Sequence, residues 1–155
     1  MTIDRFWKEH SGLKRSGSWY VVYEDVMIVS NLQKSQFGAK YYFNLGIWLV
    51  TVGGANKYPR QTDCHIWGRF GQFISADRAA IQTLLDLENG MADDARERDL
   101  WRLLTEDLLP IVKRADSLPH VLEMFRDGCF AQALMTPEAR ELARVQAPFH
   151  EGDLG

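Results

Sequence analysis

The chain has 155 residues, 46% of them hydrophobic and 25% charged, which is the composition of one ordinary globular domain. No apolar run is long enough to span a bilayer, and residues 1–17 are too charged for a secretory signal, so we expect a cytoplasmic protein with no membrane partner. Its two cysteines, Cys64 and Cys129, stand far apart, which argues against a disulfide framework and a tetrahedral zinc site.

The charges are unevenly divided between the two halves of the chain. Residues 1–75 contain nine Lys or Arg against five Asp or Glu, whereas residues 76–155 contain nine against sixteen. Because there is no stripe of basic residues, the sequence predicts no nucleic-acid partner. The acidic half is either a set of solvated helix faces or a surface that attracts a basic protein partner.

The first half of the chain has the pattern of one short helix followed by four strands. Residues 3–10 predict the helix, with Phe6 and Trp7 as its apolar anchors. Runs rich in β-branched and aromatic residues predict strands over 17–24, 26–35, 40–50 and 63–73. Short connections predict an antiparallel meander, and Gly68 and Gly71 predict a bulge or bend in the fourth strand.

From Ser75 onward, the apolar residues recur at helical spacing. The pattern predicts helices over 75–89, 93–112, 117–125 and 137–145, with a kink or break at Pro110 in the second. Residues 147–155 have the composition of a loose tail. The expected fold is a single α+β domain over residues 1–146: a four-stranded antiparallel meander sheet with helices packed on one face, and a helical C-terminal half.

Strand alternation predicts which side of the sheet faces the helices. In the third strand, the odd-numbered residues 41–49 form a wholly apolar set, so they must belong to the core. In the fourth strand, Cys64, Ile66, Gly68 and Phe70 are expected to face the same core. A one-residue slip between residues 26–35 and 40–50 would exchange the two faces.

The opposite face of the expected sheet carries amide, aromatic and guanidinium side chains. This mixture is enriched at binding sites, and an amide in a sheet must be hydrogen-bonded, solvated or used on a ligand. The other interpretation is an ordinary solvated face with cross-strand pairs. The candidate binding residues are Asn31, Gln33, Tyr42, Asn44, Trp48, His65, Trp67 and Arg69.

The sequence has no recognisable catalytic or metal-binding pattern. Cys64 and His65 are the residue types of a nucleophilic pair, but adjacent residues of a strand point to opposite faces. The other histidines, His10, His120 and His150, have no spacing that converges on His65. We therefore expect no metal ion, no cofactor and no catalytic residue, and we favour a function other than catalysis.

Several segments of the first half resemble a known family. They are Gly17–Tyr20, Asn31–Ser35, Tyr42–Ile47 and Asp63–Arg69, together with Trp101 in a later helix. Over residues 12–116 the chain resembles the bacterial family called domain of unknown function 4304. The resemblance implies a compact bacterial cytoplasmic α+β domain, and it supplies no activity and no catalytic residue.

Three functions stay open on the sequence. The favoured hypothesis is a non-catalytic protein-binding or inhibitor module, and its most concrete form is an immunity protein that neutralises a bacterial toxin. The alternative is a small-ligand- or nucleotide-binding enzyme with a pocket on the open sheet face, built from Asn31, Asn44, His65 and Arg69. The third is a structural module that dimerises through an exposed aromatic face, so both a monomer and a homodimer are compatible with the sequence.

Overall fold

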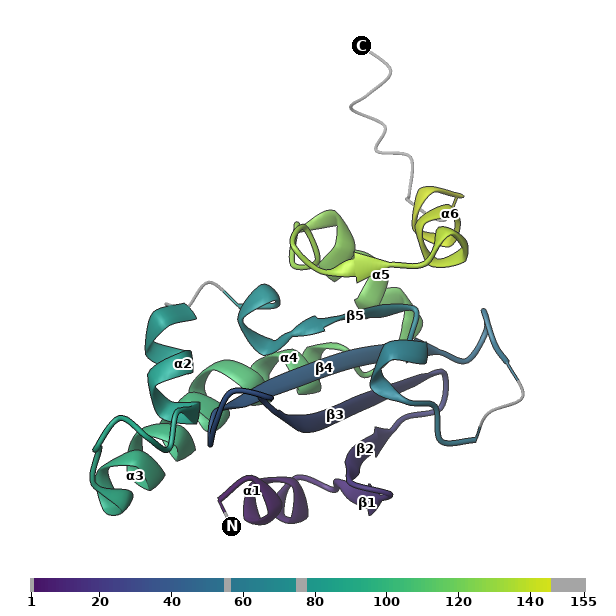
Figure 1. Cartoon of the computed structure of the whole chain (residues 1–155). Helices are drawn as coiled ribbons and strands as arrows, with labels where there is room; N and C mark the ends of the chain where they lie inside the picture. Colours follow the sequence, from purple (N-terminus) through teal and green to yellow (C-terminus); the bar gives the residue numbers. More distant parts are fainter. Residues whose placement is uncertain (1, 55–56, 75–77, 146–155) are drawn as a thin grey trace.

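A six-stranded antiparallel sheet forms the centre of the structure, a computed structural model that describes residues 2–54, 57–74 and 78–145 (Figure 1). The strands lie side by side in chain order: β1 (Leu13–Arg15), β2 (Ser18–Val22), β3 (Val26–Lys34), β4 (Tyr41–Leu49), β5 (Ile66–Arg69) and β6 (Leu134–Met135). The α+β class and the antiparallel meander are confirmed, but the prediction of four strands is wrong. The two missed strands lie at the edges, and at three and two residues they are too short to show an alternating pattern.

The described helices come before and after the first five strands. They are α1 (Thr2–Glu9), α2 (Arg78–Leu85), α3 (Asp93–Leu103), α4 (Leu109–Arg114), α5 (Leu118–Arg126) and α6 (Pro137–Val145). The expected helical C-terminal half is therefore confirmed in outline. Ser75, the first residue of the helix predicted over 75–89, and the predicted tail over 147–155 lie outside the described residues. No helix within the described ranges is long and apolar enough to cross a membrane.

The irregularity that Pro110 predicts in the long helix lies one turn earlier. A π-helical stretch, Leu104–Leu108, joins α3 to α4, and the residues that flank it have helical backbone angles. Pro110 then occupies the first turn of α4. Because Pro110 has no N–H, it cannot bond to a carbonyl of the turn before it, and the wider π-helical turn lies directly before the proline while the chain stays helical.

The fourth predicted strand is much shorter than expected. Only Ile66–Arg69 pairs as β5, and one-turn 3₁₀ helices, Gln61–Asp63 and Phe70–Gln72, flank it on both sides. The bend expected near Gly68 and Gly71 is the point where the chain leaves the sheet. There the side-chain Oε1 of Gln72 accepts a hydrogen bond from the Arg69 N–H at 2.8 Å, which replaces the next bond of the ladder.

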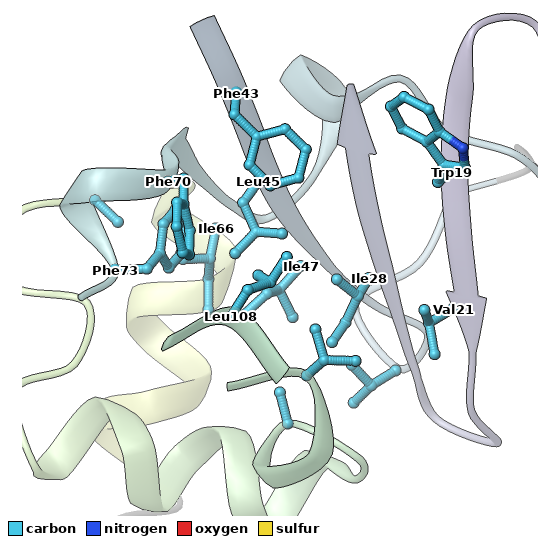
Figure 2. Close-up of a cluster of buried hydrophobic side chains, with 14 of the residues drawn as sticks. Trp19, Val21, Ile28, Phe43, Leu45, Ile47, Ile66, Phe70, Phe73 and Leu108 are labelled. Carbon is cyan, nitrogen blue, oxygen red and sulfur yellow. The ribbon is translucent and has the colours of Figure 1, made fainter. Parts of the chain in front are cut away.

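The main core lies between one face of the sheet and the helices. Phe43, Leu45, Ile47 and Leu49 of β4 are all buried there, which confirms the assignment of this set to the core. Side chains of β3, β4 and β5 gather in the same cluster as Leu108 of the π-helical stretch (Figure 2). Helices therefore cover one face of the sheet, as the alternation predicts.

The other face of the sheet is partly covered by the chain between β4 and β5. A second, smaller cluster of buried side chains lies there, and it contains Tyr20, Met27, Val29, Trp48 and Cys64. The Tyr20 hydroxyl donates a hydrogen bond to the Pro59 carbonyl at 3.0 Å, which holds the covering segment down. The expectation that Cys64 faces the main core is wrong, because strand alternation begins only at Ile66, after the 3₁₀ turn.

Candidate functional site

A row of polar residues crosses four strands of the sheet on the face away from the main core. Ser18 of β2 pairs with Asn31 of β3, Asn31 with Asn44 of β4, and Asn44 with Arg69 of β5. In the next row Gln33 pairs with Tyr42. The pairing confirms the register on which the shared face depends, because directly paired residues of an antiparallel sheet lie on the same side.

Asn44 is the centre of this polar surface. Its Nδ2 donates hydrogen bonds to Asn31 Oδ1 at 2.9 Å and to Gln33 Oε1 at 3.2 Å, and its side chain is almost fully buried, with 8% of its surface exposed. The side-chain amides of Asn31 and Gln33 thus accept from Asn44 through their oxygen atoms, which leaves their own N–H₂ groups without a role in these bonds. In the described part of the chain, no acceptor takes the hydrogens of those two N–H₂ groups.

Arg69 and Tyr42 extend the surface toward β5. The guanidinium carbon of Arg69 lies 3.6 Å from the centroid of the Tyr42 ring, a close cation–π stack. Stacking holds the planar guanidinium in one orientation while its N–H groups stay available to a partner. Among the described residues Arg69 has no ion-pair partner. We call Asn31, Gln33, Tyr42, Asn44 and Arg69 the donor surface, because its free polar groups are mostly hydrogen-bond donors.

A shallow hollow of about 490 Å³ opens beside Asn44. Much of its wall was not among the candidate residues: Ser16, Gln61 and Thr62 carry no pattern that would single them out. Gly17 and Ser18 stood out only as part of a segment that resembles the family. Gln61 has a structural role, because its Nε2 donates to the carbonyls of Leu45 at 2.9 Å and Gly68 at 3.2 Å. A polar loop residue gives no sequence signal of such a role, which depends on the contact with the sheet.

The remaining three candidates, Trp48, His65 and Trp67, lie toward the other end of the sheet and are covered. Trp48 and His65 are 8% and 5% exposed, and their ring centroids lie 4.4 Å apart. Trp67 is half-buried and packs against the second cluster. Trp48 and His65 are therefore too buried to contribute to the exposed aromatic face of the third hypothesis.

His65 and Cys64 are both held in ways that serve packing. The Nδ1 of His65 accepts a hydrogen bond from the Leu49 N–H at 2.8 Å, and burial lowers the pKa of this imidazole. Burial, with Asp63 beside it, raises the pKa of the Cys64 thiol well above the ordinary range, so the thiol stays protonated. The thiol donates to the Arg60 carbonyl at 3.5 Å. Within residues 2–54, 57–74 and 78–145, no cluster of His, Cys, Asp and Glu could hold a metal ion.

The family model described as domain of unknown function (DUF4304) matches residues 10–114. The chain belongs to this family. The matched part of the DUF4304 chain runs from the end of α1 to the end of α4, so it contains β1 to β5 and all eight candidate residues. The C-terminal elements α5, β6 and α6 follow the matched part. Neither a curated protein nor a solved structure matches the chain.

Proposed function

We propose that this DUF4304 chain is a non-catalytic protein-binding module that holds its partner on the donor surface. The observation that carries the proposal is the hydrogen-bond pattern around Asn44, which leaves the N–H₂ groups of Asn31 and Gln33 free beside the Arg69 guanidinium. Such a surface complements a partner segment rich in carboxylate or carbonyl oxygens. Arg and Tyr are also the residue types that dominate binding energy at protein interfaces.

The donor surface is pre-organised for binding. Asn44 fixes both neighbouring amides by hydrogen bonds, and the Tyr42 ring fixes the Arg69 guanidinium by stacking. A partner would therefore lose little binding energy to the ordering of these side chains. The inhibitor hypothesis rests on this rigidity, because an inhibitor must occlude its target tightly.

The most concrete form of the proposal is a bacterial cytoplasmic immunity protein that neutralises a toxin. A toxin whose active site is built from carboxylates would present the acceptors that suit the donor surface, and charge complementarity would also speed their association. This chain would then act by covering the active site, in a stoichiometric complex.

A pull-down from the native lysate with mass spectrometry tests the proposal. The test variant is Gln33→Ala/Arg69→Ala, which removes two exposed groups of the donor surface and leaves Asn44 in place. Its matched control is Arg126→Ala/Gln132→Ala, the same two residue types at exposed positions in the C-terminal part. We expect one protein partner at 1:1 stoichiometry, retained by the control and bound about 30-fold more weakly by the test variant.

The outcome that contradicts the proposal is equal capture by the test variant and the control, or no partner for either. For the immunity form, the captured protein expressed alone should arrest growth, and co-expression of this chain should restore it. A partner with no toxicity would reject the immunity form and keep the protein-binding module.

A second candidate function is a small-ligand-binding protein or enzyme that uses the hollow beside Asn44. Its volume of about 490 Å³ is within the range of small-molecule sites. Its lining of hydroxyl and amide groups suits a polar ligand such as a nucleotide. A thermal-shift screen of purified protein against nucleotides separates the two candidates, since only a ligand-binding hollow would stabilise the protein without any protein partner.

A further inference from the structure

The tip of the β3–β4 hairpin exposes a large aromatic side chain. Phe37 is 90% exposed, the highest exposure among the large hydrophobic residues described. It precedes Gly38, whose φ of +142° is a backbone conformation that favours glycine. Exposed phenylalanine on a loop tip leaves apolar area in water, so a contact that covers Phe37 would be favourable.

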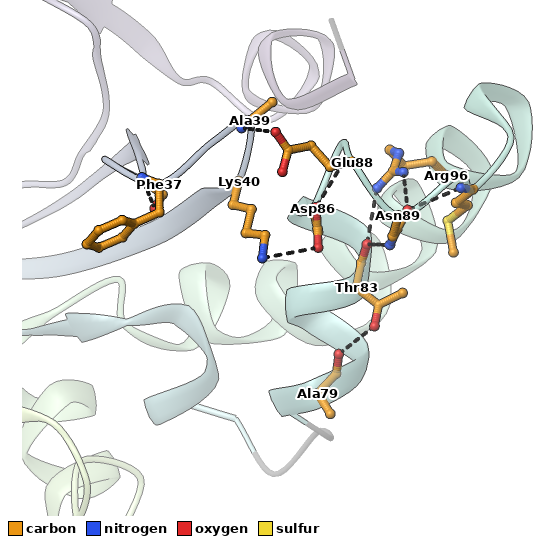
Figure 3. Close-up of polar contacts among 11 residues, drawn as sticks. Phe37, Ala39, Lys40, Ala79, Thr83, Asp86, Glu88, Asn89 and Arg96 are labelled. Atoms are coloured by element: carbon orange, nitrogen blue, oxygen red, sulfur yellow. Dashed lines mark hydrogen bonds and ion pairs between the residues drawn. The ribbon is translucent and has the colours of Figure 1, made fainter.

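The hairpin tip is held in place from one side by the chain after α2 (Figure 3). The Ala39 N–H donates to Glu88 Oε1 at 3.1 Å, and the Leu87 N–H donates to the Ala39 carbonyl at 2.9 Å. Lys40 Nζ lies 3.9 Å from Asp86 Oδ2. The tip therefore presents Phe37 from a pre-organised backbone, which reduces the entropy that a contact would cost.

An apolar cavity of about 510 Å³ lies next to the loop end of the same hairpin. It is bounded by α1, the ends of β3 and β4 beside the loop, α2 and α3, and its apolar lining includes Ile3, Leu32, Tyr41, Leu84, Leu87 and Leu100. Leu87 is itself 53% exposed at the mouth. The cavity is large enough for a phenyl ring and has the apolar lining that such a ring requires.

We propose that the chain forms a two-fold homodimer in which Phe37 of each copy inserts into this cavity of the other copy. The hairpin supplies both Phe37 at its tip and Leu32 and Tyr41 in the cavity wall, so the inserted group and the receiving cavity are neighbours. One two-fold axis can then form both contacts at once and close the assembly.

The charges around the two features also complement each other. Lys34 and Lys40 flank the tip on either side, and Asp93 and Glu97 lie among the residues that line the cavity. Arg96 also lines it, but its guanidinium already donates to the carbonyls of Thr83 and Leu84 and to Asn89 Oδ1. In the isolated chain, Lys40 and Glu97 each have a long ion pair: Lys40 lies 3.9 Å from Asp86, and Glu97 lies 3.8 Å from Arg5. Lys34 and Asp93 have no ion-pair partner among the described residues. Opposite charges around an apolar contact select the partner orientation and favour a second copy of this chain.

Sedimentation velocity over a concentration series tests the proposal on the full chain. We expect a concentration-dependent dimer for the wild type, and Phe37→Ser should raise its dissociation constant at least about 100-fold, because each dimer loses two buried phenyl groups. Leu87→Ser, at the cavity mouth, should weaken the dimer in the same direction. The matched control is Leu134→Ser, which removes another hydrophobic residue that is 55% exposed and should leave the dimer unchanged.

A mixing experiment checks the exchange of side chains between the two copies. Phe37→Ser keeps the cavity but lacks the inserted ring, while Leu84→Trp keeps the ring but fills the cavity. Each variant alone should be monomeric with a cooperative melting transition, and an equimolar mixture should recover a weaker dimer with one of the two contacts.

Three results would overturn the proposal. They are a wild type that stays monomeric over the series, a dimer that survives Phe37→Ser, and chains that grow beyond the dimer with concentration. The donor surface lies on the opposite face of the same hairpin, because Gln33 and Tyr42 alternate with Leu32 and Tyr41 of the cavity wall, so Phe37→Ser should still capture the partner of the proposed function. Failure of one proposal can therefore be distinguished from failure of the other.

Discussion

The carboxylate of Asp25 accepts a hydrogen bond from the backbone N–H of Leu118 at 3.1 Å, across 93 positions of the sequence. Asp25 lies in the turn between β2 and β3, and Leu118 is the first residue of α5. The cap residue of this helix, Ser117, accepts a single bond from the His120 N–H at 3.4 Å. A carboxylate from the sheet thus completes the capping of a helix in the C-terminal part, where the helix dipole also favours it.

Replacement of Asp25 should therefore destabilise the fold. We expect Asp25→Ala to lower the free energy of unfolding by about 1 kcal/mol, the usual cost of a lost helix cap, as measured by urea denaturation. Asp25→Asn keeps an oxygen acceptor and should lose less. The control is Glu24→Ala, an exposed carboxylate in the same turn. Equal losses for Asp25→Ala and Glu24→Ala would show that the bond to Leu118 contributes nothing.

His65 should make the protein sensitive to mild acid. Burial lowers the pKa of His65 below its ordinary value of 6.5, so the unfolded chain binds a proton more readily than the folded one. The stability that neutral His65 provides is complete above pH 6.5 and is lost as the pH falls toward the folded pKa. Protonation at Nδ1 also breaks the bond from the Leu49 N–H. Urea denaturation from pH 7.5 to 5.5 should show this loss, and His65→Gln should reduce it.

His120 supplies a control of opposite sign. Its Nδ1 lies 2.5 Å from Asp116 Oδ1, and this hydrogen bond raises the pKa of the exposed His120 imidazole. Its contribution is therefore present below pH 6.5 and is lost as the pH rises through the folded pKa. His120→Gln should leave the acid loss intact or steepen it. If His120→Gln abolished the loss and His65→Gln did not, the assignment to His65 would be wrong.

The two cysteines should differ sharply in reactivity. Cys64 is fully buried and its thiol pKa is raised, whereas Cys129 is partly exposed. With a thiol-specific reagent at pH 8, the folded protein should show one rapidly labelled cysteine, and the second should react only on unfolding. Cys129→Ser should remove the rapid phase and Cys64→Ala should keep it. Rapid labelling of Cys64 in the folded protein would contradict the burial of the second cluster beneath the segment between β4 and β5.

Gly46 is a position where the covering segment lies directly against the sheet. A Cβ at Gly46 would lie 2.7 Å from Cys64 Sγ and 2.9 Å from the Gln61 carbonyl oxygen. Gly46→Ala should therefore lower the free energy of unfolding by about 1–3 kcal/mol, the range for overpacked sites. The control is Gly71→Ala, where the nearest atom is the flexible Arg78 Cγ at 3.2 Å. Similar melting temperatures for the two variants would mean that the covering segment can move away from an added methyl group at little cost in stability.

Local patterns were enough to predict most of the regular elements. The long alternating runs of β3 and β4 are joined by a short connection, so a common face for Asn31 and Asn44 could be predicted, and the pairing of these two residues confirms the register that a one-residue slip would have changed. Ser117, the first residue of the helix predicted over 117–125, caps α5, and Gly128, with a φ of +82°, follows the end of that helix. These features depend on neighbours within a few residues, which the sequence displays directly.

Contacts between distant segments decided the rest. Strand β6 exists because Ile66 and Trp67 pair with Met135 and Leu134, almost seventy positions later, and two residues carry no pattern of their own. Trp48 and His65 are covered, because Tyr20 and Gln61 hold the chain after β4 against the sheet, whereas Gln33 and Arg69 of the donor surface stay exposed. Alternation determines the side of a sheet on which a residue lies, but burial of that side depends on which remote segment packs there. The composition of the candidate face was therefore set by the sequence itself, and its final extent by tertiary packing.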